Sequence, residues 1–132
     1  MYKQVVDIVR AVGRGNLQVA GPEDGWEKLV LEGQAGTLTL SPMVRQVPDD
    51  EFSRLVMGMY GFFQSAETDQ VEVKQAVLDT VSEAEMFIGV VAEPTFCEED
   101  GHSACVLAIV AAVEGMLFDG ETMIGGDGNR IL

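Results

Sequence analysis

The spacing of apolar residues between Phe52 and Phe63 constrains the fold of this chain more than any other feature. Apolar side chains recur three, four, seven, ten and eleven positions after Phe52, as they do along one face of an amphipathic α-helix. Pro48 and the three acids that follow it are typical of a first helical turn, because proline has its φ preset and carboxylates favour the positive end of the helix dipole. Gly58 and Gly61 each cost about 1 kcal/mol relative to alanine, so we expect close packing at these two glycines. The predicted inward face comprises Phe52, Leu55, Val56, Met59, Phe62 and Phe63.

Further patterns predict three more helices and an antiparallel sheet. Helical spacing indicates helices at 2–12, 69–84 and 104–116. Strands at 26–31 and 37–40, joined by EGQAG, read as a β-hairpin, and a brief alternation at Leu17 and Val19 precedes them. The unbroken apolar run 86–92 is typical of a central strand buried on both faces, and 117–118 and 123–124 indicate two short strands. This order predicts a single α+β domain over residues 1–132, with a mostly antiparallel sheet and about four helices packed on it.

The balance of charge limits the partners that the chain can bind. It carries 22 acids and 8 bases, a net charge of −14 at pH 7. Residues 36–132 hold 17 of the acids and four of the bases, a net charge of −13. Such a surface repels nucleic-acid phosphates and anionic lipids, so we expect no nucleic-acid partner and no membrane partner. It attracts a basic protein, although acidity also serves plain solubility.

The longest apolar run, Ala104 to Val113, has ten residues, about half the length of a membrane-spanning helix. We also see no secretory leader, and two cysteines do not make a disulfide framework. These features predict a protein of a bacterial-type cytoplasm with reduced thiols.

The stretch FCEEDGHSAC (96–105) holds both cysteines and the only histidine. Cys97, His102 and Cys105 are candidate zinc ligands, with Asp100 or water completing a tetrahedron. The spacing matches no standard zinc finger, however, and the three acids at 98–100 oppose formation of a thiolate at Cys105. A loop that opens a helix, with Cys105 as a small core residue, is the simpler interpretation. No motif for a cofactor and no catalytic triad accompanies these residues, so we expect no cofactor.

Exposed acids and one methionine are the candidate contacts for a protein partner. Met57 falls off the apolar face of its helix, and adaptable methionine surfaces suit partner binding. The acids at 49–51 begin one predicted helix, and those at 98–100 precede the predicted helix 104–116. The candidate partner-binding residues are Asp49, Asp50, Glu51, Met57, Glu98, Glu99 and Asp100.

Two stretches near the C-terminus, IGVVAEPTF (88–96) and LAIVAAVEGMLFDGETMIGGDG (107–128), resemble an ending found in small uncharacterised bacterial α+β proteins. Some of those proteins are similar to the immunity partners of polymorphic toxins, which implies a protein partner. The length, the low isoelectric point and the order of elements over 2–40 also resemble acidic type III secretion chaperones. The chain departs from that family after residue 48, where two successive helices stand in place of strands.

These observations predict a non-enzymatic, acidic protein-binding domain, in its sharpest form an immunity-type partner of a basic toxin or effector. One alternative is a secretion-type chaperone, and another is a metal- or thiol-dependent enzyme centred on Cys97, His102 and Cys105. We also expect a homo-oligomer, because an apolar content of 47% leaves a domain of this size spare surface to bury.

Overall fold

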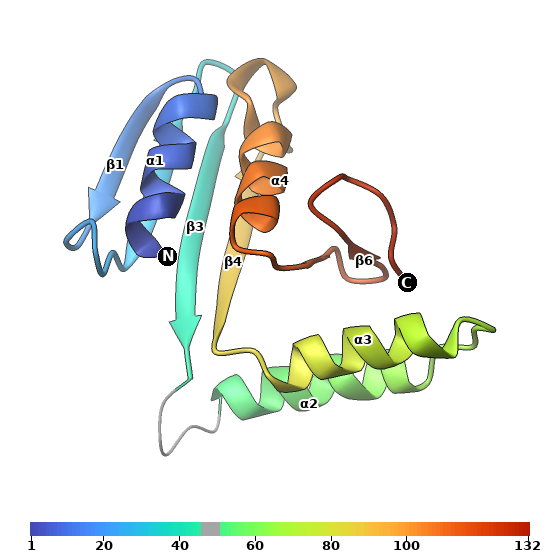
Figure 1. The fold of residues 1–132 in the computed structure, drawn as a ribbon. Helices are drawn as coiled ribbons and strands as arrows, with labels where there is room; N and C mark the ends of the chain where they lie inside the picture. The colour runs from blue at the N-terminus through green and yellow to red at the C-terminus, as the bar shows by residue number, and fades with distance from the viewer. Residues whose placement is uncertain (46–50) are drawn as a thin grey trace.

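A four-stranded antiparallel sheet in the order β1-β2-β3-β4 is the centre of the fold (Figure 1). The computed structural model describes residues 1–45 and 51–132. The strands are β1 (Asn16–Ala20), β2 (Lys28–Glu32), β3 (Thr37–Val44) and β4 (Met86–Glu93). Leu29 pairs with Leu40 and Leu31 with Leu38, so the leucines of β2 and β3 share one face. The predicted hairpin is confirmed, although β2 begins two residues later than expected and Trp26 precedes it.

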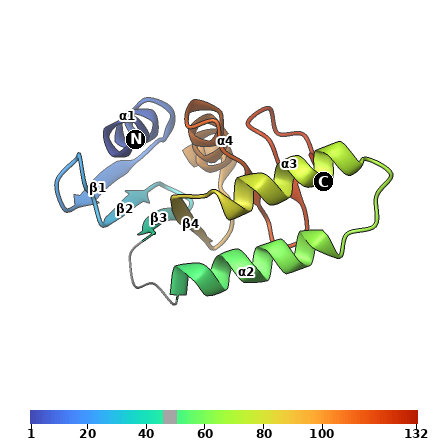
Figure 2. The ribbon, with the colours of Figure 1, turned by 60° about the horizontal axis from the view of Figure 1, so that its bottom comes forward.

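Two helices cover the leucine face of this sheet (Figures 1 and 2). They are α1 (Tyr2–Val12) and α4 (His102–Ala112), and both contribute apolar residues to the main core. Trp26 closes this core at one end, where its indole Nε1–H donates a hydrogen bond to the backbone oxygen of Tyr2 at 3.0 Å. The core consists of Val5, Val6, Val9, Trp26, Leu29, Leu31, Leu38, Leu40, Cys105, Val106 and Ile109.

A second core joins a helical hairpin to the C-terminal segment. The hairpin is formed by α2 (Glu51–Gln64) and α3 (Val71–Ser82), which lie side by side in Figure 2. The C-terminal segment carries the short antiparallel pair β5 (Leu117–Phe118) and β6 (Met123–Ile124), as the sequence predicts. The second core consists of Met59, Phe63, Val77, Leu78, Val81 and Met123. With the 3-10 turn η1 (Glu98–Asp100), these elements confirm the predicted α+β fold.

The amphipathic face of α2 is only partly buried. Phe52, Met59 and Phe63 lie in the interior, whereas 41% of the Leu55 side chain and 46% of Phe62 are exposed. Met57 is 72% exposed, as predicted. The expectation of close packing at Gly58 and Gly61 is wrong, because a Cβ added at either position would have no atom within 4 Å.

The prediction that β4 is a central strand is also wrong. Among the described strands, β4 pairs with β3 alone and forms an edge of the sheet. Ile88, Val90 and Ala92 face the core under α1 and α4. Val91, on the opposite face, is 54% exposed. An apolar run therefore indicates a strand here but does not place it within the sheet.

The ends of two helices differ from the sequence-based expectation. α3 begins at Val71 rather than Asp69, because the Gln70 N–H donates to the Thr68 hydroxyl at 3.1 Å in a tight turn before the helix. α4 begins at His102 after Gly101, which has a φ of +72°, so Ser103 lies in the first turn and is not the cap. α4 ends at Ala112, and Glu114, with a φ of +52°, turns the chain away. None of the described helices has the length and apolar character needed to cross a membrane.

Candidate protein-binding surface

Cys97, His102 and Cys105 do not converge on a common point. The Cys97 N–H donates to His102 Nδ1 at 3.1 Å, so the proton of the neutral ring is on Nε2. That Nε2 is buried and has no hydrogen-bond partner among the residues that the structure describes. The Cys97 thiol contacts the backbone oxygen of Thr95 at 3.3 Å, whereas Cys105 is fully buried in the main core, where burial raises its thiol pKa. Within residues 1–45 and 51–132, no three histidine, cysteine or acidic side chains are grouped to hold a metal ion.

Asp100 is a structural residue, which corrects its assignment as a partner contact. Its carboxylate is 3% exposed and accepts hydrogen bonds from the N–H groups of Gln34 (2.9 Å), Ala35 (2.9 Å) and Gly36 (3.1 Å). Burial by itself raises the pKa of Asp100. The three hydrogen bonds lower it by a larger amount, so the pKa lies below its usual value. The carboxylate therefore fixes the β2–β3 loop to η1 and is not free to bind a partner.

Those of the other predicted contacts that the structure describes lie at opposite ends of the molecule. Glu98 and Glu99 are exposed in η1, near the end of the sheet at the top of Figure 1. Glu51 and Met57 are exposed on α2 at the bottom of the same view. Asp49 and Asp50 lie outside the described residues. The structure therefore does not bring Glu98 and Glu99 into one contact face with Glu51 and Met57.

Negative charge gathers instead on what we call the helical layer, residues 51–85 and 114–132. This layer contains α2, α3 and the C-terminal segment, and it carries eleven acids and three bases, a net charge of −8. The other described residues carry nine acids and five bases, a net charge of −4. Two stretches far apart in the sequence thus combine into the most acidic part of the fold.

Two cations, Lys74 and Arg45, donate to backbone oxygens and form no ion pair with the acids of this layer. The Lys74 ammonium contacts the oxygens of Gln64 (2.6 Å) and Ala66 (3.0 Å) at the end of α2. Arg45 donates to the oxygen of Ala84 at 2.9 Å and lies over the Phe52 ring. Among the described residues the one ion pair joins Arg10 to Glu23, outside the helical layer.

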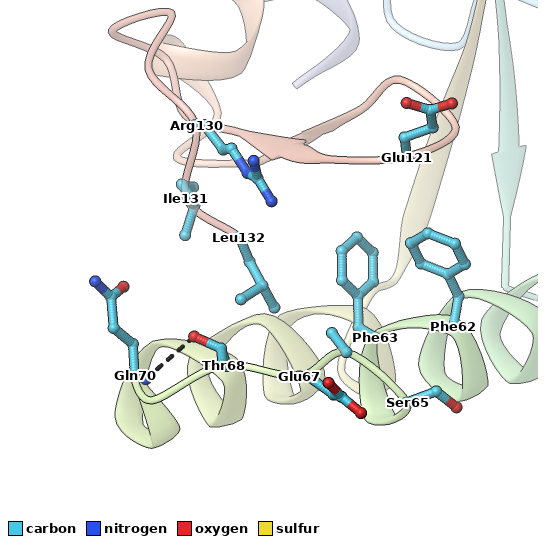
Figure 3. Close-up of a pocket in the computed structure, with 11 residues that line it drawn as sticks. Phe62, Phe63, Ser65, Glu67, Thr68, Gln70, Glu121, Arg130, Ile131 and Leu132 are labelled. Carbon is cyan, nitrogen blue, oxygen red and sulfur yellow. Dashed lines mark hydrogen bonds between the residues drawn. The ribbon is translucent and has the colours of Figure 1, made fainter.

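A groove of about 730 Å³ opens between the α2–α3 turn and the end of the chain (Figure 3). Its apolar lining consists of Phe62, Phe63, Ala66, Ile131 and Leu132. The rings of Phe62 and Phe63 meet edge to face with their centroids 5.1 Å apart. Its polar lining consists of Ser65, Glu67, Thr68, Gln70, Glu121 and Arg130. The Phe62–Phe63 pair was visible in the sequence, but nothing in the spacing indicated that 130–132 would face it.

The charged side chains of the groove are available to bind a partner, as far as the described residues show. Glu67, Glu121 and Arg130 are exposed, and they make no side-chain hydrogen bond or ion pair with other described residues. Phe62 adds exposed aromatic surface beside them. An apolar lining beside free carboxylates suits a segment that carries both apolar and cationic side chains.

Comparisons of the chain with models of protein families, with curated proteins and with solved structures gave no match. The function is therefore inferred from the groove and from the distribution of charge.

Proposed function

We propose that this protein is a non-enzymatic, acidic domain that binds a basic protein partner through the groove and the surrounding helical layer. The observation that carries the proposal is the net charge of −8 on that layer. None of its acids forms an ion pair with another described residue. A field of this sign speeds the encounter with a basic protein and disfavours acidic ones.

The groove supplies the apolar part of the contact. Its volume admits one or two large apolar side chains of a partner segment, which would pack on Phe62. Lysine or arginine residues flanking them would then approach Glu67 and Glu121. Aromatic surface at the centre with charge at the rim is the usual composition of a protein interface.

An immunity-type partner of a basic toxin or effector is the sharpest form of this proposal. The chaperone alternative has less support, because α2 and α3 follow β3 directly where that family would have strands. The enzyme alternative also has less support, because no three histidine, cysteine or acidic side chains of the described residues are grouped to hold a metal ion, and Cys105 is buried in the main core.

We predict that reversing the two carboxylates of the groove weakens binding of a basic probe. The probe is an amphipathic Leu/Lys peptide, and the variant is Glu67→Lys/Glu121→Lys. At low salt the dissociation constant, measured by titration calorimetry, is expected to rise about tenfold, because two attractive charges become repulsive. Salt should weaken binding of the wild-type protein more than binding of the variant.

The matched control is Asp24→Lys/Glu27→Lys, which makes the same change of net charge in the exposed β1–β2 turn. In this control we expect the dissociation constant of the peptide to change by less than about twofold, because only the overall electrostatic field of the protein is altered. Equal loss in both variants would show that the groove has no particular role. Wild-type affinity that does not change with salt would remove the electrostatic basis of the proposal.

Self-association remains a prediction, and the exposed apolar side chains of α2 are the surface we propose for it. Leu55, Met57 and Phe62 are all exposed on this helix. Light scattering at high protein concentration and moderate salt should then show a mass above that of the monomer. A Leu55→Ser/Met57→Ser variant should return the mass to that of the monomer, and a wild-type protein that is monomeric throughout would refute the prediction.

A further inference from the structure

The outer edge of β4 presents backbone groups with which no described segment pairs. The Arg45 N–H donates to the Glu85 oxygen at 3.0 Å, just beyond the β3–β4 ladder. Because hydrogen-bonded pairs alternate along antiparallel strands, Pro42 and Ile88 form a non-bonded pair, as the missing N–H of proline requires. The N–H and C=O groups of Ile88, Val90 and Ala92 therefore point away from β3. No hydrogen bond from another described segment reaches them.

This edge lacks the features by which proteins usually protect an exposed strand. β4 is eight residues long, and between Met86 and Ala92 it contains no charged residue and no proline. Gly89 lies in the middle, where an added Cβ would meet only the Ser41 oxygen, at 3.6 Å. A long, apolar, unpaired edge of this kind is a template for another strand.

The acids at the two ends of β4 determine which strand can be added. Glu85 precedes the strand and Glu93 ends it, and both are exposed. A second copy could pair its own β4 in antiparallel registers centred on Gly89 or on Val90. Both registers place Glu93 of one copy opposite or diagonal to Glu85 of the other, and like charges so placed are destabilising. Each copy also carries a net charge of −14.

We propose that the edge of β4 binds an extended segment of a protein partner that has uncharged residues in its middle and lysine or arginine at its two ends. The backbone of that segment pairs with Ile88, Val90 and Ala92, and its cations lie beside Glu85 and Glu93. The inference rests on the proposed function in that the partner is basic, but it concerns a surface separate from the groove.

The direct test uses a capped peptide, Lys-Val-Thr-Val-Thr-Val-Thr-Val-Lys, whose lysines have the same separation as Glu85 and Glu93. We expect it to slow hydrogen exchange at the amides of Ile88, Val90 and Ala92, as observed by NMR. At low salt we expect it to bind about tenfold more tightly than the same peptide with glutamate ends. A peptide with proline at its fourth position, which lies opposite Val90 when the lysines face Glu93 and Glu85 in antiparallel register, should bind more weakly, because it lacks one backbone donor to β4.

Two variants test the edge from the side of the protein. Ala92→Pro removes an outward N–H without removing a β3–β4 hydrogen bond. The dissociation constant of the lysine-ended peptide should rise about tenfold or more in this variant. Glu85→Lys/Glu93→Lys should reverse the preference, so that the glutamate-ended peptide binds more tightly. Asp24→Lys/Glu27→Lys should leave the preference unchanged. If Ala92→Pro fails to fold, as judged by circular dichroism, the charge-reversal pair still decides the outcome.

The inference is overturned if the lysine-ended peptide fails to bind, or binds without protecting these amides. A preference that survives the Glu85→Lys/Glu93→Lys change would also overturn it. Protection of the same amides without peptide, in a protein with the mass of a dimer, would assign the edge to a second copy. None of these results affects binding of the Leu/Lys peptide at the groove, so the edge and the proposed function can fail separately.

Discussion

Replacing Phe63 with alanine is expected to lower the free energy of unfolding by about 3–5 kcal/mol, the usual cost of removing a fully buried aromatic ring. Phe63 is 1% exposed and is one of the residues through which α2 contacts the C-terminal segment. Its ring centroid lies 5.3 Å from that of Phe118 on β5, in an edge-to-face arrangement. Chemical denaturation followed by circular dichroism would measure the loss.

Phe62→Ala is the matched control for this prediction, because it removes the same ring from the adjacent position. Phe62 is 46% exposed, so we expect a loss of only about 1 kcal/mol in the free energy of unfolding. This variant should instead weaken binding of the Leu/Lys peptide, since Phe62 presents its ring to the groove. Equal losses of stability would show that the second core does not depend on Phe63 as described. Unchanged binding by Phe62→Ala would count against the groove.

Asp100→Asn is expected to lower the melting temperature by on the order of 5–10 °C at neutral pH. Both carboxylate oxygens accept backbone N–H bonds, and the amide NH₂ of asparagine cannot accept one. At least one N–H of the β2–β3 loop would then be left without a partner at a buried site. Glu99→Gln, a neighbouring change at an exposed acid, should leave the melting temperature unchanged within about 1 °C.

The effect of Asp100 should depend on pH in a defined direction. Its pKa in the folded protein is lowered relative to an unfolded value of about 3.9. Its contribution to stability is therefore fully present above that unfolded value and is lost as the pH falls through the folded pKa. The difference in melting temperature between the wild-type protein and Asp100→Asn should shrink as the pH falls below about 4. A difference that stays constant down to strongly acidic pH would contradict a role for the charged carboxylate.

The position of Asp100 shows where reasoning from sequence reached its limit. Three consecutive acids before a helix are expected on electrostatic grounds, and two of them, Glu98 and Glu99, are exposed as such an argument implies. The third points inward, because the β2–β3 loop brings three N–H groups to it. A Cβ at Gly33 would overlap the Asp100 carboxylate, so the glycine in that loop makes room for it. The local pattern contains no trace of this long-range contact.

The same limit applies to β4 and to α2. The apolar run 86–92 identified a strand, but its place at the edge depends on which strands pair, and of the strands that the structure describes only β3 pairs with it. The apolar face of α2 identified a helix, but the exposure of Phe62 beside the buried Phe63 depends on where the C-terminal segment packs. Periodicity records which residues are apolar, and the neighbours of an element determine how much of its apolar face is covered.

The sequence by itself determined the kinds of element, their order, the α+β class and the acidic character of the protein. Each of these follows from local spacing or from composition, which do not depend on how distant segments meet. The tertiary structure alone decided which acids are free and which is buried, where the charge gathers, and which surfaces stay open. Those properties arise because residues 51–85 and 114–132 pack together, and because the sheet ends at β4, with no other described strand on its outer edge.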